Sequence, residues 1–262
     1  RKHVAMSKEV VAHNKIDLLV WSESILNTAV PRHRLQHTIK QMFNGLQTPV
    51  LLGVPIMHPI EDGKQSHYNS AVLAKPDGWV CRDCRYDKNI LFPVGEQFVS
   101  AQNSATDSKA IASDSTTIIP FQGHSIATYI CFEALVPDYV RKLAKDAELL
   151  INPSYDGWFG NTEEAPIHEA LSRMRAIENR KPLVRAAMSG ISTIVDPVGR
   201  IVQRAGVQEE KALISRVTFM KNRTVYSYVG NRPWWVVVAA LLFVRIFAIR
   251  RARGQKEFQG VG

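Results

Sequence analysis

Cysteine is scarce in this sequence, which has three cysteines, Cys81, Cys84 and Cys131, among its 262 residues. Cys81 and Cys84 form a C-x-x-C pattern, the spacing of a redox pair or of half a zinc site. A second pair of cysteine or histidine ligands at a suitable spacing is missing, which argues against zinc. We expect an incidental turn at this pattern, with a disulfide and a metal site as the alternatives. Cys131 is left without a partner in each case.

A stripe of basic residues interleaved with aromatic ones is also missing, although the formal net charge is +9. A nucleic-acid partner is therefore not expected. Part of the basic excess lies in RRARGQK, residues 250–256, directly after an apolar segment, a position typical of the flank of a membrane helix. No internal repeat is present, and the first residue is Arg1 with no signal-peptide pattern. We expect the chain to be part of a longer protein.

One long apolar segment, WWVVVAALLFVRIFAI at residues 234–249, carries a single charge, Arg245. At about 1.5 Å per residue it extends roughly 24 Å, slightly less than the ~30 Å hydrocarbon core of a bilayer. Its two leading tryptophans and the arginines after its end suit the two membrane interfaces. We predict a transmembrane helix at 233–250, with a buried helix of a soluble domain as the alternative, and a basic cytoplasmic tail at 251–262.

The rest of the chain, residues 1–232, alternates strand-like and helix-like segments in its middle and has hairpin patterns towards its ends. This order predicts an α/β domain with a mixed sheet or sheets. Pro76-Asp77-Gly78 marks one hairpin turn. We expect strands at 16–23, 49–57, 68–80, 124–131, 148–154, 182–187 and 191–205, and helices at 3–14, 32–46, 136–147 and 167–180.

Three residues with acid, base or nucleophile chemistry lie at or near the ends of strand-like runs. Glu23 ends LLVWSE, Lys88 lies in YDKNILFPVGE, and Cys131 ends IATYIC. Strand ends are where α/β folds present their chemistry, and a thiol needs a nearby base or cation before it attacks. Each residue also has an ordinary structural interpretation, as an acid at a helix start, a surface lysine and a core thiol.

The short motifs around these residues resemble those of the nitrilase superfamily, whose members use a Glu-Lys-Cys triad. VWSES, the YDKNILFPVGE word with eight residues from Lys88 to Glu96, and ICFE resemble its apolipoprotein N-acyltransferase branch most. NPSYDGWFG, the run RMRAIENRKPLVRAAMSGISTIVDPVGRI and GNRPWW before the apolar segment match that branch too. The resemblance covers roughly residues 16–240. It implies a four-layer αββα sandwich whose first strand is missing from this chain, as is the family's bundle of N-terminal membrane helices.

The resemblance also implies a reaction, the transfer of an acyl chain from a phospholipid to the N-terminal amine of a lipoprotein. Cys131 would form a thioester, Glu23 would act as the general base and Lys88 would stabilise the oxyanion, with no cofactor or metal. The matching supporting residues are Glu96, Phe132, Glu133 and Trp158. The protein would lie in a bacterial inner membrane, with its catalytic domain in the periplasm and its C-terminus in the cytoplasm. A periplasmic location would permit a Cys81–Cys84 disulfide.

The chain departs from the family pattern at three places. An aromatic residue is replaced in Val94-Gly95-Glu96, a proline is missing from WSES, and the tract at 100–115 is polar where the family has lipid-contacting loops. Two alternatives therefore stay open beside the acyltransferase. One is a C–N hydrolase that acts on a small amide or nitrile, and the other is a membrane-anchored nitrilase-like protein of conjugal transfer with another acyl substrate.

Overall fold

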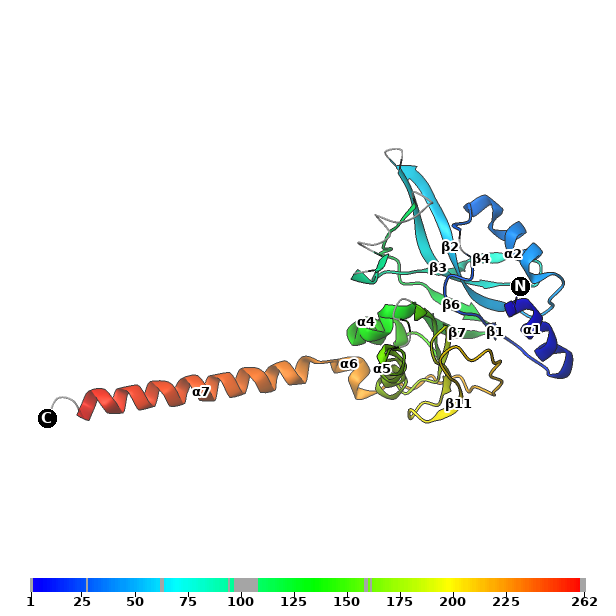
Figure 1. Ribbon diagram of the computed structural model, residues 1–262. Helices are drawn as coiled ribbons and strands as arrows, with labels where there is room; N and C mark the ends of the chain where they lie inside the picture. The colour runs from blue at the N-terminus through cyan, green and yellow to red at the C-terminus, as the bar shows by residue number, and fades with distance from the viewer. Residues whose placement is uncertain are drawn as a thin grey trace.

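The computed structural model describes residues 2–26, 28–61, 64–93, 95–96, 108–157, 160 and 162–259. Its body is a sandwich of two β-sheets with helices on the outer faces, and one long helix projects from it (Figure 1). This arrangement is the expected four-layer αββα fold. The mixed α/β character predicted from the order of elements is confirmed.

The first sheet is built by strands from residues 19–110. Its strand order is β1 (Leu19–Val20), β2 (Val50–Glu61), β3 (Lys64–Ala74), β4 (Val80–Asp87), and β5 (Ser108–Ala110) pairs with β3. β1 pairs with β2 in parallel, and the β2–β3–β4 meander is antiparallel. The outer face is covered by α1 (Lys2–His13), by the short 3-10 helix η1 (Arg32–Arg34) and by α2 (Leu35–Phe43).

Helix α2 shows why these helices stay on the sheet. Leu35, Ile39 and Phe43 recur at four-residue spacing, lie on one side of the helix and are buried against Val50, Leu52 and other β2 side chains. Burying each such side chain stabilises the fold by about 1.5–3 kcal/mol. The helix ends at Asn44, which has a left-handed φ of 48° and closes the last turn.

The second sheet has six strands in the order β11-β10-β9-β8-β7-β6. The three central strands are parallel to one another, and the outer ones pair antiparallel. Helices α4 (Pro137–Ala144) and α5 (Glu164–Asn179) cover its outer face. The strands are β6 (Ile118–Phe121), β7 (His124–Thr128), β8 (Leu149–Tyr155), β9 (Leu183–Met188), β10 (Ser192–Val195) and β11 (Ile201–Ala205).

The main core contains side chains from both sheets. Leu51 and Tyr86 of the first sheet and Ile126 and Leu150 of the second belong to one buried cluster. β8 is buried along almost its whole length, as expected for a central strand with both faces covered. The packing holds the ends of β1, β4 and β7 in fixed relative positions, and the three predicted catalytic residues follow those ends.

Two local expectations were wrong. The strand expected to end at Cys131 ends at Thr128, and Cys131 instead begins the 3-10 helix η3 (Cys131–Leu135). Cys81 and Cys84 form a disulfide and not an incidental turn. The pairing of β3 with β4 is irregular here, because Val72 opposes Arg85 whereas Ala74 opposes Val80. The extra residues of β4 bulge from the ladder, and the disulfide closes this bulge.

The C-terminal part leaves the sandwich through α6 (Val225–Val229) and continues as α7 (Arg232–Gln259), which points away from the body (Figure 1). Within the described chain, α7 is the one helix long and apolar enough to cross a membrane, over Arg232–Ile249, and none of this stretch is buried. Trp234 and Trp235 at its start are more than two-thirds exposed. The exposed apolar side chains of this helix are those of a surface that contacts a membrane or another protein, because the sandwich does not bury them.

Candidate active site

Three strand ends from the two sheets meet around a cavity of about 220 Å³. Glu23 follows β1, Lys88 follows β4, and Cys131 lies three residues after β7. These segments are far apart in the sequence, and only the packing of the two sheets brings them together. The lining residues are Glu23, Lys88, Phe92, Glu96, Cys131, Phe132, Leu135, Glu164 and His168.

Cys131 occupies a strained position at the turn between β7 and η3. Its φ is +49°, a left-handed conformation that costs an ordinary residue roughly 1–2 kcal/mol. The side chain is buried, and its thiol donates a weak hydrogen bond to the Tyr155 carbonyl at 3.8 Å. Burial raises the pKa of this thiol, the charge of Glu23 raises it further, and Lys88 opposes both. The resting residue is therefore a neutral thiol that needs a base.

Lys88 is a buried cation held by two acids. Its ammonium lies 3.2 Å from Glu23 Oε1 and 2.8 Å from Glu96 Oε2. Burial alone would lower the pKa of Lys88, but the charges of Glu23 and Glu96 raise it above its usual range. The lysine stays protonated at neutral pH. It can therefore supply a fixed positive charge beside Cys131, where an oxyanion would develop.

Glu23 has one engaged and one free carboxylate oxygen. Oε1 accepts hydrogen bonds from Lys88 and from Asn69 Nδ2, the latter at 2.6 Å, whereas buried Oε2 has no partner among the residues that the structure describes. Burial raises the pKa of Glu23, although Lys88 opposes the shift. A carboxylate with a raised pKa and a free oxygen is suited to take a proton from a nearby thiol.

Asn69 links the two acids, and the sequence had not pointed to it. Its amide donates to Glu23 Oε1 at 2.6 Å and to Glu96 Oε1 at 2.9 Å. Glu96 also accepts from the backbone N–H of Phe92. Asn69 lies inside β3 without a recognisable motif, so its contribution becomes visible only when β3 is placed between β2 and β4.

Glu133 fixes backbone and does not face the cavity. It is fully buried, and its Oε1 accepts from the N–H groups of Asn89 and Ile90. Its Oε2 accepts from the Ile130 N–H and from the Tyr86 hydroxyl, both at 2.7 Å. One carboxylate thus connects the segment after Lys88 to the segment before Cys131. This arrangement accounts for an acid two residues after the cysteine.

Phe132 forms part of an apolar wall. Its ring lies 5.6 Å from that of Phe92, tilted by 55°, and both line the cavity with Leu135. These side chains offer an apolar surface next to the thiol. Trp158, the remaining predicted site residue, lies outside the described residues, as do Val94 and residues 100–107 of the polar tract.

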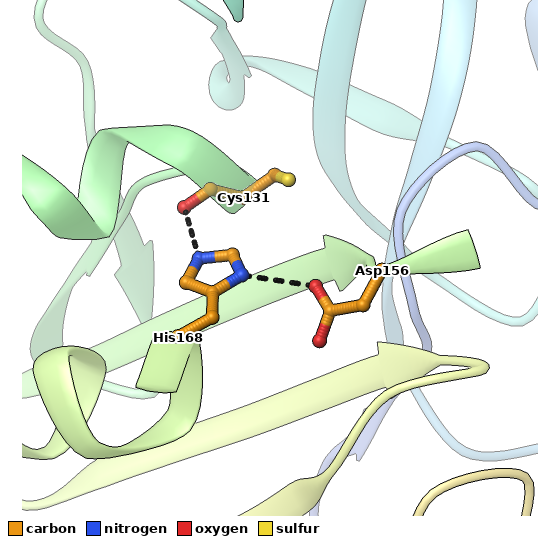
Figure 2. Close-up of side chains that lie close together, drawn as sticks. All are labelled: Cys131, Asp156 and His168. Atoms are coloured by element: carbon orange, nitrogen blue, oxygen red, sulfur yellow. Dashed lines mark hydrogen bonds and ion pairs between the residues drawn. The ribbon is translucent and has the colours of Figure 1, made fainter. Parts of the chain in front are cut away.

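A second buried network holds the backbone of Cys131, and no motif in the sequence pointed to it (Figure 2). His168 Nε2 lies 3.2 Å from the Cys131 carbonyl oxygen, and His168 Nδ1 lies 3.0 Å from Asp156 Oδ1. Arg185 forms an ion pair with Asp156 at 2.8 Å. The network ties the strained turn at Cys131 to α5, to the end of β8 and to β9.

Cys131, His168 and Asp156 are also the residue types of a Cys-His-Asp triad. Figure 2 shows that the imidazole faces the carbonyl oxygen of Cys131, while the sulfur points away from the ring. The donor atoms lie within 4.8 Å of one another, which is also compatible with a metal site. A cation would compete with Arg185 for Asp156, because both carboxylate oxygens already accept from the guanidinium. The geometry favours a structural network.

The carbon-nitrogen hydrolase family model matches residues 1–224. The chain belongs to this family, which agrees with the two-sheet sandwich and with the cysteine at the cavity. The cysteine-based enzyme class expected from the sequence is thereby supported, whereas the roles of the individual residues remain predictions.

Curated relatives carry a more specific name. The apolipoprotein N-acyltransferase of Geobacter metallireducens is 32% identical over an alignment of 260 residues, which covers 94% of this chain and 48% of the relative. That of Pseudomonas putida is 28% identical over 253 residues and covers 91% and 48%. The chain therefore spans about half the length of the curated relatives that it matches.

Solved structures confirm the fold. Nit3 of Saccharomyces cerevisiae, a member of branch 10 of the nitrilase superfamily, aligns with a TM-score of 0.60 and 21% identity over 80% of each chain. A carbon-nitrogen hydrolase from Helicobacter pylori gives 0.59 and 20% over 79% of each chain. The expected nitrilase-type sandwich is therefore established.

Proposed function

We propose that this chain catalyses N-acyl transfer, with a phospholipid as the acyl donor and the N-terminal amine of a lipoprotein as the acceptor. The observation that carries the proposal is the meeting of Glu23, Lys88 and Cys131 at one apolar-walled cavity, in a chain whose curated relatives are named apolipoprotein N-acyltransferases.

In the first half-reaction, Glu23 takes the thiol proton of Cys131 and the sulfur attacks the ester carbonyl of the phospholipid. Lys88 stabilises the oxyanion that forms, and the backbone N–H of Phe132 is the proposed second donor. The C–O bond then breaks, Glu23 returns the proton to the leaving alkoxide, and a thioester remains on Cys131. Phe92 and Phe132 would contact the acyl chain.

Helix α7 supports a membrane location. Its Arg232–Ile249 stretch is apolar and unburied, and exposed Trp234 and Trp235 suit an interface. We infer a transmembrane segment in a bacterial inner membrane, with residues 1–232 in the periplasm and the basic end in the cytoplasm. The Cys81–Cys84 disulfide is compatible with this oxidising compartment.

The first experiment is to incubate the full-length protein in bilayers containing phosphatidylethanolamine and to measure its intact mass. The wild type should gain one acyl group that hydroxylamine removes, and Cys131→Ala should gain none. Wild-type protein that never acquires an acyl group on Cys131 would falsify the acyltransferase proposal.

The same preparation tests the C–N hydrolase alternative, for which the triad geometry is equally suitable. Hydrolysis of short aliphatic amides without acylation by phospholipid would favour an amidase. The unburied apolar surface of α7 favours the transferase, because a hydrolase of small soluble amides has no need of a membrane helix.

A further inference from the structure

Glu164 is an acid at the cavity that lies outside the proposed triad and contacts the supporting network only through His168. It is the first residue of α5, lines the cavity beside Cys131, and its side chain is 27% exposed. Its Oε1 lies 3.6 Å from His168 Nδ1, and its Oε2 is buried without a hydrogen-bond partner among the described residues.

The cations near Glu164 are already engaged. Lys88 is shared by Glu23 and Glu96, and Arg185 is bound by both oxygens of Asp156. Burial raises the pKa of Glu164 to about 7, the charge of Asp156 adds to the rise, and Arg185 opposes it. Among the described residues, Glu164 thus has no lysine or arginine of its own, and it can hold or release a proton near neutral pH.

The second half-reaction requires such a group. An α-amino group has a pKa of about 7.7–8.0, so much of the acceptor arrives as an ammonium that cannot attack a carbonyl. A carboxylate attracts this ammonium and can accept one proton, since the two pKa values are close. Only the neutral amine left behind is a nucleophile.

We propose that Glu164 binds the ammonium group of the acceptor and takes one of its protons, so that the amine can attack the Cys131 thioester. The inference rests on the proposed function. It assigns the part of the cavity beside Glu164 to the acceptor amine. The acceptor it selects is a primary amine, in preference to water or an alcohol.

Glu164 takes one proton from the ammonium, and the neutral amine attacks the thioester carbonyl. Glu23 takes a second proton from the nitrogen as the C–N bond forms, and the oxyanion collapses with cleavage of the C–S bond. Glu23 then protonates the departing Cys131 thiolate. Glu164 releases its proton to solvent, which leaves an amide, a free thiol and both carboxylates.

The test separates the two half-reactions and compares Glu164→Gln with Glu163→Gln. Glu163 is the adjacent, exposed acid and does not line the cavity, so its variant removes the same charge from the same helix start. Each protein is first acylated on Cys131 by phosphatidylethanolamine. The thioester is then exposed either to a diacylglyceryl-cysteinyl peptide or to hydroxylamine, a nucleophile that is already neutral near pH 7.

Glu164→Gln should acylate Cys131 at the wild-type rate but transfer the acyl group to the peptide about 100-fold more slowly, within the range of a lost general base. Its reaction with hydroxylamine should be unchanged, and Glu163→Gln should match the wild type in every assay. Wild-type transfer by Glu164→Gln, or an equal loss with peptide and hydroxylamine, overturns the role of Glu164. Absence of acylation in the wild type overturns the proposed function itself, and this inference with it.

Discussion

At the scale of single residues, the environment of Cys131 is not that of a pre-ionised thiol. Burial and the charge of Glu23 favour the protonated form, and only Lys88 favours the thiolate. The environment therefore favours a protonated thiol at rest, whose proton Glu23 is proposed to take. The buried site already holds two carboxylates, Glu23 and Glu96, against one cation, Lys88. A thiolate at Cys131 would add a third negative charge.

We therefore expect the alkylation rate of Cys131 by iodoacetamide to rise with pH to a midpoint above that of a free thiol. Lys88→Met should move this midpoint higher still, because the lysine charge lowers the thiol pKa. Lys75→Met, which removes an exposed lysine, is the control and should leave the midpoint unchanged. A wild-type midpoint at or below that of glutathione would contradict the assignment of a neutral resting thiol.

At the scale of elements, the site depends on how closely strands approach the segments that carry its residues. β2 passes directly behind Glu23, and the backbone N–H of Gly53 donates to the Ser22 carbonyl at 3.1 Å. A Cβ at Gly53 would lie 2.5 Å from the Cα of Glu23, too close for any side chain. Glycine at this position permits the close backbone contact that positions Glu23 at the cavity.

Gly53→Ala should therefore displace Glu23 and slow the acylation of Cys131 at least tenfold, with a loss of about 1–3 kcal/mol in the free energy of unfolding from overpacking. Gly206→Ala is the matched control, because its added Cβ would meet its nearest neighbour at 3.4 Å. Thermal unfolding and single-turnover acylation measure the two effects. An unchanged acylation rate in Gly53→Ala would show that the position of Glu23 tolerates movement of β2.

At the scale of the whole molecule, the sandwich and α7 differ in whether their apolar side chains are buried. The sandwich buries its apolar side chains between two sheets and under the helices on their outer faces. The Arg232–Ile249 stretch of α7 leaves its apolar side chains uncovered. A bilayer is the environment that covers such a helix on all sides, and the start of α7 follows the sandwich directly through α6.

Fusions at the C-terminus test the proposed orientation in bacterial cells. Green fluorescent protein, which folds in the cytoplasm, should fluoresce when joined after residue 262, whereas alkaline phosphatase, which needs the periplasm, should be inactive there. The reverse pattern would place the basic end in the periplasm and refute the orientation inferred from the positive flank.

The sequence by itself determined the order of the elements and the chemistry-bearing residues. Helices such as 35–43 follow from local periodicity, and buried strands such as 149–155 follow from a short apolar run; both signals depend only on neighbours in the chain. Glu23, Lys88 and Cys131 were identified as catalytic candidates because each belongs to a short motif at or near the end of a predicted strand. Their roles remain predictions, but the residues do meet at one cavity.

The tertiary structure alone decided what depends on distant neighbours. Asn69 and His168 have no local signal, because their contacts come from segments far away in the chain. Glu164 has none because it lines a cavity that exists only once distant segments have packed together. The disulfide depends on a bulge in β4 that pairing with β3 creates. The protonation of Cys131 depends on burial and on the sum of nearby charges. Burial and charge are properties of the packed molecule, and no short stretch of sequence contains them.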